Sequence, residues 1–132
     1  MKKRLSSLEK ISHLQSKLHD LTVWRLAAID QQRQALEAAE RAMIDVLNRD
    51  AIAHGAPAAA ASTRLRSIGR EIAVAKADYQ AQSKRVRDQG ARAKLAERLV
   101  ESADAEYRAQ KDRKDLGDLI ERSLHGKPSS SA

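Results

Sequence analysis

The stretch that decides the fold is LRSIGREIAVAKADYQAQSKRVRDQGARAKLAERLVESADAEY, residues 65–107. Its apolar and small residues recur at alternating steps of three and four over about six heptads, which is typical of a long α-helix packed along one narrow stripe. The stripe consists of Leu65, Ile68, Ile72, Ala75, Tyr79, Gln82, Val86, Gln89, Ala93, Ala96, Val100, Ala103 and Tyr107. Because much of it is alanine, we expect close packing with modest burial.

A second helix is expected before this stretch, from about residue 5 to residue 53. Ser6 and Glu9 have the spacing of a capping box near its start, and the pairs Glu37–Arg41 and Asp45–Arg49 have the spacing of helix-stabilising ion pairs. Its apolar positions follow the same three-and-four rhythm, with one slip near residues 22–26. They are Leu8, Ile11, Leu18, Leu26, Ile29, Leu36, Met43 and Leu47.

One strong helix breaker separates the two helices, the segment His54-Gly55-Ala56-Pro57. The sequence therefore predicts an all-α protein in which two long helices form an antiparallel coiled-coil hairpin over residues 1–125. The turn is expected at 54–58, helix two at about 59–124, and a disordered tail at 126–132. Pairing outward from the turn places Leu18 near Ala96, and it leaves residues after about 113 without a partner on helix one.

Composition argues against several classes of protein. The chain has no cysteine, one tryptophan, two tyrosines and no phenylalanine, and much of its 42% hydrophobic content is alanine. Large apolar side chains are too few for a compact core, and no apolar run is long enough to span a bilayer. No phosphate-binding loop, metal-ligand spacing or nucleophile set is present, so we expect no enzyme activity, no cofactor and no metal. A cytoplasmic location is expected.

Positive charge is concentrated in the middle of the chain, where residues 64–98 hold ten basic and four acidic side chains. The heptad places six of them on the outer face of helix two: Arg66, Arg70, Lys84, Arg87, Lys94 and Arg98. This basic stripe is either a solvated face or a contact for an acidic protein, membrane or nucleic-acid surface. Nucleic acid is the less favoured partner, because no aromatic residue that could stack on bases lies among these charges.

Trp24 and Leu26 belong to an apolar cluster, residues 21–29, that surrounds nearly the whole circumference of helix one. A hairpin buries only one stripe of a helix, so part of the cluster is a candidate partner contact. The competing interpretation is local, since the expected register pairs Trp24 with Gly90, where the missing side chain leaves room for the indole.

The end of helix two carries a second candidate contact. An amphipathic stripe lies on the part expected to overhang helix one, and it consists of Leu116, Leu119, Ile120 and Leu124. Helical ends with apolar faces dock into grooves or self-associate. The alternative is that this end frays.

Two segments of helix two resemble a known family. Residues 91–98 (ARAKLAER) and 107–119 (YRAQKDRKDLGDL) are similar to the C-terminal helix of the FliJ/YscO family, the small coiled-coil proteins of flagellar and virulence type III export. The opening residues Leu5, Leu8, Ile11, Leu14 and Leu18 resemble that family's N-terminal helix. The end Lys114-Asp115-Leu116-Gly117-Asp118-Leu119 departs from the family pattern in having Gly117 where aspartate is common.

The resemblance implies a cytoplasmic export component, free or peripheral at the inner membrane. It implies that the paired helix ends enter the hexameric export ATPase, and that the protein also contacts the export gate and escorts export chaperones. Two other functions remain open from the residues alone: a basic coiled-coil module that binds nucleic acid non-specifically, and a structural scaffolding coiled coil.

Overall fold

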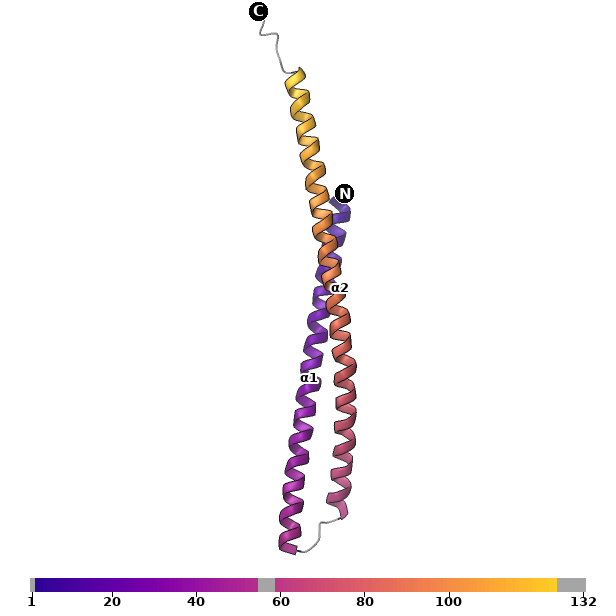
Figure 1. Ribbon diagram of the computed structural model, residues 1–132, viewed down its shortest axis with the longest axis vertical. Coiled ribbons are helices and arrows are strands. Elements are labelled where there is room, and N and C mark those ends of the chain that lie inside the picture. Colours follow the sequence, from indigo (N-terminus) through magenta and orange to yellow (C-terminus); the bar gives the residue numbers. More distant parts are fainter. Residues whose placement is uncertain (1, 55–58, 126–132) are drawn as a thin grey trace, which may run out of the picture. The chain divides into compact units, whose positions relative to one another are not determined.

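Two long helices make up the whole of the described structure. The computed structural model describes residues 2–54 and 59–125, and contains α1 (Lys2–His54) followed by α2 (Ala59–His125). They form an all-α helical hairpin (Figure 1). α1 begins three residues before the expected start and includes His54, which the sequence placed in the turn. The rest of the expected turn and the expected disordered tail lie outside the described residues.

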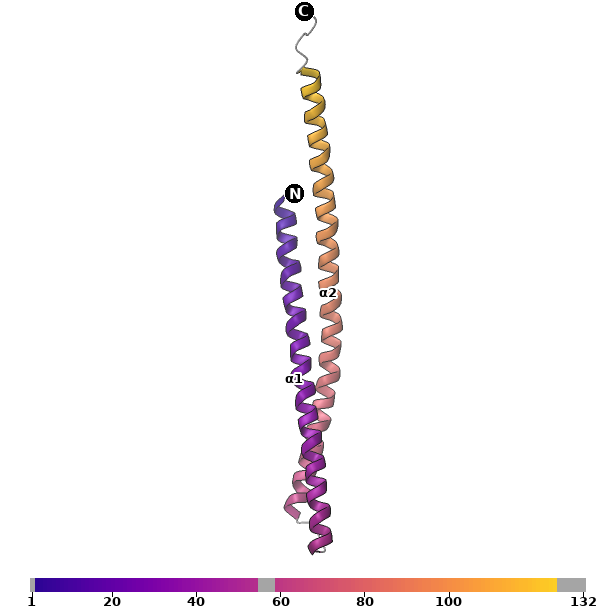
Figure 2. The same ribbon diagram turned by 90° about the vertical axis from the view of Figure 1, so that its left-hand side faces the viewer.

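Each helix contributes to two compact units. The central unit consists of residues 17–54 of α1 and 59–90 of α2, and the terminal unit consists of residues 2–16 of α1 and 91–125 of α2. Within each unit the α1 segment lies beside the α2 segment and runs in the opposite direction, as both views show (Figure 1 and Figure 2). The backbone hydrogen bonds of an α-helix lie within the helix, so the contacts that join the two helices are made by side chains, either with each other or with a backbone carbonyl of the other helix.

The seam on α2 follows the predicted heptad without a break. All thirteen predicted positions from Leu65 to Tyr107 are buried or half-buried. The most enclosed apolar ones are Ile68, Ile72, Ala75, Ala93 and Ala96. No described side chain is both large and completely enclosed, which agrees with the modest burial expected from an alanine-rich stripe.

The seam on α1 differs from the prediction in its N-terminal half. The seam positions run in strict steps of three and four, with no slip: Leu5, Leu8, Ser12, Gln15, His19, Thr22, Leu26, Ile29, Arg33, Leu36, Glu40, Met43 and Leu47. Asp30 and Glu37, each next to a seam residue, are also half-buried. Ile11 and Leu18, which were expected in the seam, are 49% and 38% exposed. Because the heptad of α2 is unbroken, the same face of α1 contacts α2 along its length. Polar residues therefore occupy some seam positions of α1, and Ile11 and Leu18 beside them face outward.

Polar contacts in the central unit determine where the helices meet. The side-chain Nε2 of Gln82, which is 2% exposed, donates a hydrogen bond to the backbone oxygen of Thr22 at 3.1 Å. The hydroxyl of Thr22 in turn donates to the backbone oxygen of His19 at 2.7 Å. The expected register would have placed His19 about five residues farther along α2 than Gly90, beside which its ring lies, so in this region the pairing is closer to the turn than predicted.

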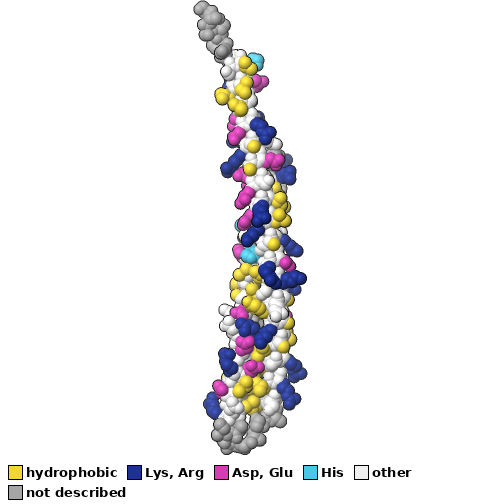
Figure 3. All heavy atoms as spheres, viewed as in Figure 1, with side chains coloured by type: hydrophobic (Ala, Val, Ile, Leu, Met, Phe, Trp, Pro, Cys, Tyr) yellow, Lys and Arg dark blue, Asp and Glu magenta, His cyan; other side chains and the backbone are white. Residues whose placement is uncertain are grey.

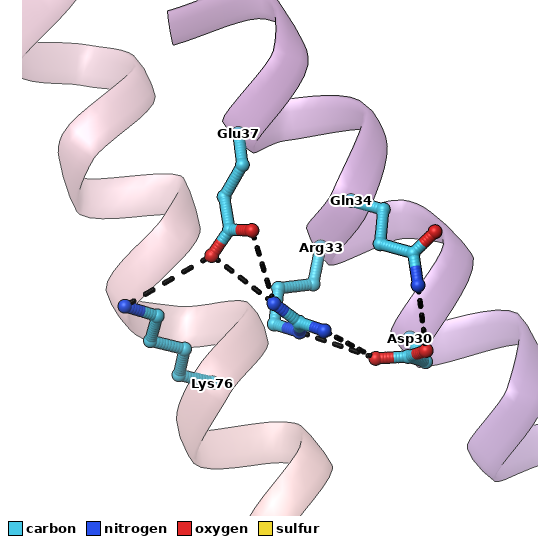
Figure 4. Close-up of polar contacts among 5 residues, drawn as sticks. All are labelled: Asp30, Arg33, Gln34, Glu37 and Lys76. Atoms are coloured by element: carbon cyan, nitrogen blue, oxygen red, sulfur yellow. Dashed lines mark hydrogen bonds and ion pairs between the residues drawn. The ribbon is translucent and has the colours of Figure 1, made fainter. Parts of the chain in front are cut away.

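An ion-pair cluster surrounds Arg33, a charged residue in the seam (Figure 4). Its guanidinium contacts Asp30 at 2.7 Å and Glu37 at 3.0 Å, both on α1. Glu37 also reaches Lys76 of α2 at 4.0 Å. Hydrogen bonding to Asp30 is the main cause that raises the pKa of Arg33 above its usual value. The expected pairs Glu37–Arg41 and Asp45–Arg49 are not among the ion pairs of the described residues.

Candidate docking surfaces

The C-terminal part of α2 is the first candidate surface. Every residue from 108 to 125 is exposed, including four aliphatic side chains that are 52–72% exposed. They are Leu116, Leu119, Ile120 and Leu124. Figure 3 shows hydrophobic side chains gathered near this end of the helix. The overhang, defined as residues 108–125, therefore presents an apolar stripe that no described residue covers.

The basic stripe is the second candidate surface. All six of its residues are exposed: Arg66, Arg70, Lys84 and Arg87 in the central unit, and Lys94 and Arg98 in the terminal unit. Within the described part of the chain none of the six forms an ion pair. A face of cations that form no close ion pair favours attraction of an acidic surface over distances set by ionic strength.

The structure separates Trp24 from Leu26. Trp24 is 73% exposed and borders a shallow groove of the central unit together with Leu18, Leu21 and Gln89. Leu26 is half-buried in the seam, so it contributes to helix packing rather than to the same outer surface. The prediction that Gly90 seats the Trp24 indole is wrong. The space beside Gly90 is taken by the His19 ring, whose Nε2 lies 3.3 Å from where a Cβ would stand.

A third surface was not singled out from the sequence. It consists of the positions one residue before each seam residue, here called pre-seam positions. On α1 these are Ile11 and Leu14 in the terminal unit and Leu18 and Leu21 in the central unit, and on α2 they include Leu95 and Leu99. All six are exposed aliphatic residues. The sequence does hold the signal, because residues 11–21 carry two parallel heptad patterns, one aliphatic and one polar.

Among the described residues no group of three or more His, Asp or Glu side chains is placed to hold a metal ion, and every buried side-chain nitrogen or oxygen has a hydrogen-bond partner. No helix of the described part has the length and apolar character needed to cross a bilayer. What the arrangement offers chemically is apolar and basic helix faces.

Comparison with protein-family models, with curated proteins and with solved structures finds no match to this chain.

Proposed function

We propose that this protein is a FliJ-like component of a bacterial flagellar or virulence type III export apparatus, acting as a stalk for the export ATPase and as an escort for export chaperones. In this proposal the protein is a binding protein and not an enzyme. The observation that carries it is the overhang, a helix end with exposed Leu116, Leu119, Ile120 and Leu124. A single helix with one apolar stripe fits a central opening lined by several copies of a subunit.

The order of the residues along the overhang supports insertion from its C-terminal end. The aliphatic residues occupy 116–124, whereas residues 108–114 carry Arg108, Lys111, Arg113 and Lys114. An apolar stripe supplies affinity once it is desolvated, and charges at its edge mainly set orientation and the rate of association. The basic stripe, from Arg66 to Arg98, would then remain free for the acidic faces of an export gate or chaperone.

The proposal is tested by binding of the chain to the hexameric export ATPase from the same organism, measured by isothermal titration calorimetry. The double variant Leu116→Asp/Ile120→Asp is expected to lose binding by at least a hundredfold, because two buried aliphatic side chains each contribute about 1.5–3 kcal/mol. Its thermal unfolding, measured at a protein concentration at which the chain is monomeric, should be nearly unchanged, since both residues are exposed in the single chain.

A matched control is available on the same helix. Val74 is 61% exposed but lies in the central unit, so Val74→Asp is expected to bind the ATPase like the unaltered chain. Equal binding by the Leu116→Asp/Ile120→Asp variant would overturn the assignment of the overhang, and the absence of any binding by the unaltered chain would overturn the proposed function.

A second candidate function rests on the unpaired charges of the basic stripe, which suit a nucleic-acid backbone. Counterion release then requires that affinity fall steeply as salt rises, roughly in proportion to the number of phosphates neutralised. Fluorescence anisotropy with duplex DNA at several salt concentrations measures this. A variant with Arg66, Arg87 and Lys94 changed to glutamine should reduce the slope, and binding that is absent or independent of salt would remove this candidate.

A further inference from the structure

The pre-seam positions of α2 in the terminal unit form an unusual pattern. They continue past the seam into the overhang in steps of four and three, and they read Leu95, Leu99, Ser102, Glu106, Ala109, Arg113, Leu116 and Ile120. The two outer residues at each end are aliphatic, and the four between them are polar, charged or small. The four aliphatic side chains are 49–58% exposed, so the whole row is available on the surface.

From this pattern we infer that α2 binds α2 of a second copy of the chain, in antiparallel orientation, through the row from Leu95 to Ile120. Antiparallel pairing about the middle of the row places Leu95 opposite Ile120 and Leu99 opposite Leu116. These pairs form twice, once at each end of the row, with the roles of the two copies exchanged. The interface is therefore two-fold symmetric and closes as a dimer. This inference does not depend on the proposed function.

Charge favours the antiparallel direction over a parallel one. In the antiparallel alignment Glu106 of one copy lies about one helical turn from Arg113 of the other, within reach of an ion pair. A parallel, in-register pair would instead place Glu106 against Glu106 and Arg113 against Arg113. Two like-charge pairs are unfavourable in the antiparallel alignment. The two Glu106 lie about three residues apart across the two-fold axis, but each is also about one turn from Arg113 of the other copy. Glu101 and Asp112 lie on the outer, solvated edge, where like charges cost little.

α1 adds to the same surface. In an antiparallel helix pair the pre-seam positions of both helices lie on the same side of the seam. Ile11 and Leu14 therefore lie on the side of the terminal unit that carries Leu95 and Leu99. The overhang of the second copy would contact both helices, and its stripe, which also includes Leu119 and Leu124, would be covered by aliphatic side chains from two directions.

This arrangement also explains the polar seam of α1. In the terminal unit Ser12 and Gln15 face α2 while Ile11 and Leu14 face outward. A helix that is more apolar beside its seam than within it is typical of a helix that packs against two neighbours. The second copy supplies the second neighbour.

The first test measures the mass of the purified chain by sedimentation equilibrium. Protein concentrations of about 5–200 µM are used, because they detect a dimer with a micromolar dissociation constant. We expect a dimer of twice the 14.6 kDa chain mass. Leu99→Asp should raise the dissociation constant of the dimer at least tenfold. The helicity of this variant, measured by circular dichroism, should be unchanged. Val74 is also a pre-seam residue, is 61% exposed and lies outside the row, so Val74→Asp should remain dimeric.

Orientation is tested with spin labels, which is straightforward because the chain has no cysteine. In the antiparallel dimer, labels on Ala105→Cys lie near the symmetry axis, and labels on Ser123→Cys are separated by about 45 Å along the helix, from about 1.5 Å per residue. A parallel dimer would bring both pairs of labels equally close.

Charge exchange completes the test. Glu106→Arg and Arg113→Glu should each weaken the dimer severalfold, and the two changes together should restore it. A monomeric chain at 200 µM, a dimer that survives Leu99→Asp, or short distances at both labelled positions would each overturn the inference.

Discussion

At the residue scale, a few side-chain contacts set how the two helices pair, and the helical pattern of the sequence does not show which side chains make them. Gln82 is the most enclosed residue described, and its amide reaches across to the Thr22 carbonyl. A buried polar group is tolerable only when it is hydrogen-bonded, and its partner then fixes the register of the helices. The sequence located Gln82 in the seam, but it could not show which carbonyl the amide would find.

The first prediction concerns this residue. Gln82→Ala is expected to lower the free energy of unfolding by about 1–3 kcal/mol, because it removes a buried hydrogen bond and the packing of the side chain stem. Gln80→Ala is the matched control, since Gln80 is exposed on the same turn of α2. Urea denaturation measures both. A cost for Gln82→Ala no larger than that of the control would show that the Thr22 contact contributes nothing.

The second prediction compares two glycines of α2. Nothing lies within 4 Å of a Cβ added at Gly69, whereas one added at Gly90 would meet the His19 ring at 3.3 Å. Gly69→Ala should therefore raise the free energy of unfolding by about 0.5–1 kcal/mol, the usual gain in a helix. Gly90→Ala should gain less, because His19 must shift. Equal gains in thermal unfolding would contradict the contact between His19 and Gly90.

At the scale of the helices, sequence reasoning succeeded on α2 and partly failed on α1. The α2 heptad has apolar or small residues at nearly every seam position, so its period alone predicts which residues are enclosed. In α1 both the aliphatic residues Ile11 and Leu18 and the polar residues Ser12 and His19 have the spacing of seam positions, and only one set can face α2. Composition favours the aliphatic set, but the structure encloses the polar one because the seam of α2 continues without a slip.

The candidate surfaces divide in the same way. Exposure of the basic stripe follows from periodicity, since its residues lie off the seam by their spacing. Exposure of the overhang follows from helix length, since helix two is longer than helix one. The pairing of Trp24 with Gly90 depended on register, which is set by individual contacts such as that of Gln82 and is not encoded in a period. Of the aliphatic pre-seam residues of α1, Ile11 and Leu18 were overlooked as surface residues because they were assigned to the seam.

The third prediction concerns the overhang as a helix. Nothing lies within 4 Å of a Cβ at Gly117, so Gly117→Ala adds helix propensity, about 1 kcal/mol, without a clash. If the overhang orders further on binding, this change lowers the entropic cost and should tighten association with the export ATPase by up to about fivefold. Calorimetry measures it. Weaker binding would indicate that the partner requires the close approach that glycine allows.

At the scale of the whole molecule, the hairpin rests on few strong contacts and many weak ones. Its enclosed apolar residues are largely alanine and isoleucine, and the ion pairs near the surface contribute little. Such a fold leaves most side chains free for partners. The overhang is the surface that both the export ATPase and a second copy would use, so these two associations are expected to exclude each other.

The fourth prediction tests the intramolecular hairpin. Glu37 and Lys76 face each other across the two helices at 4.0 Å, so a chain with cysteines at both positions should be cross-linked within one molecule by a short bis-maleimide. The product is expected to run as a monomer on a denaturing gel. Cross-linking that yields only dimers would mean that the helices pair between chains.

The measurement that tests the central claim most directly is hydrogen exchange of the chain with and without the export ATPase hexamer. We would use the Leu99→Asp variant, in which self-association is expected to be absent. We expect that backbone amides of residues 108–125 become protected on addition of the hexamer, while those of residues 60–90 exchange as before. Protection confined to residues 66–98, with unchanged exchange at 108–125, would contradict it.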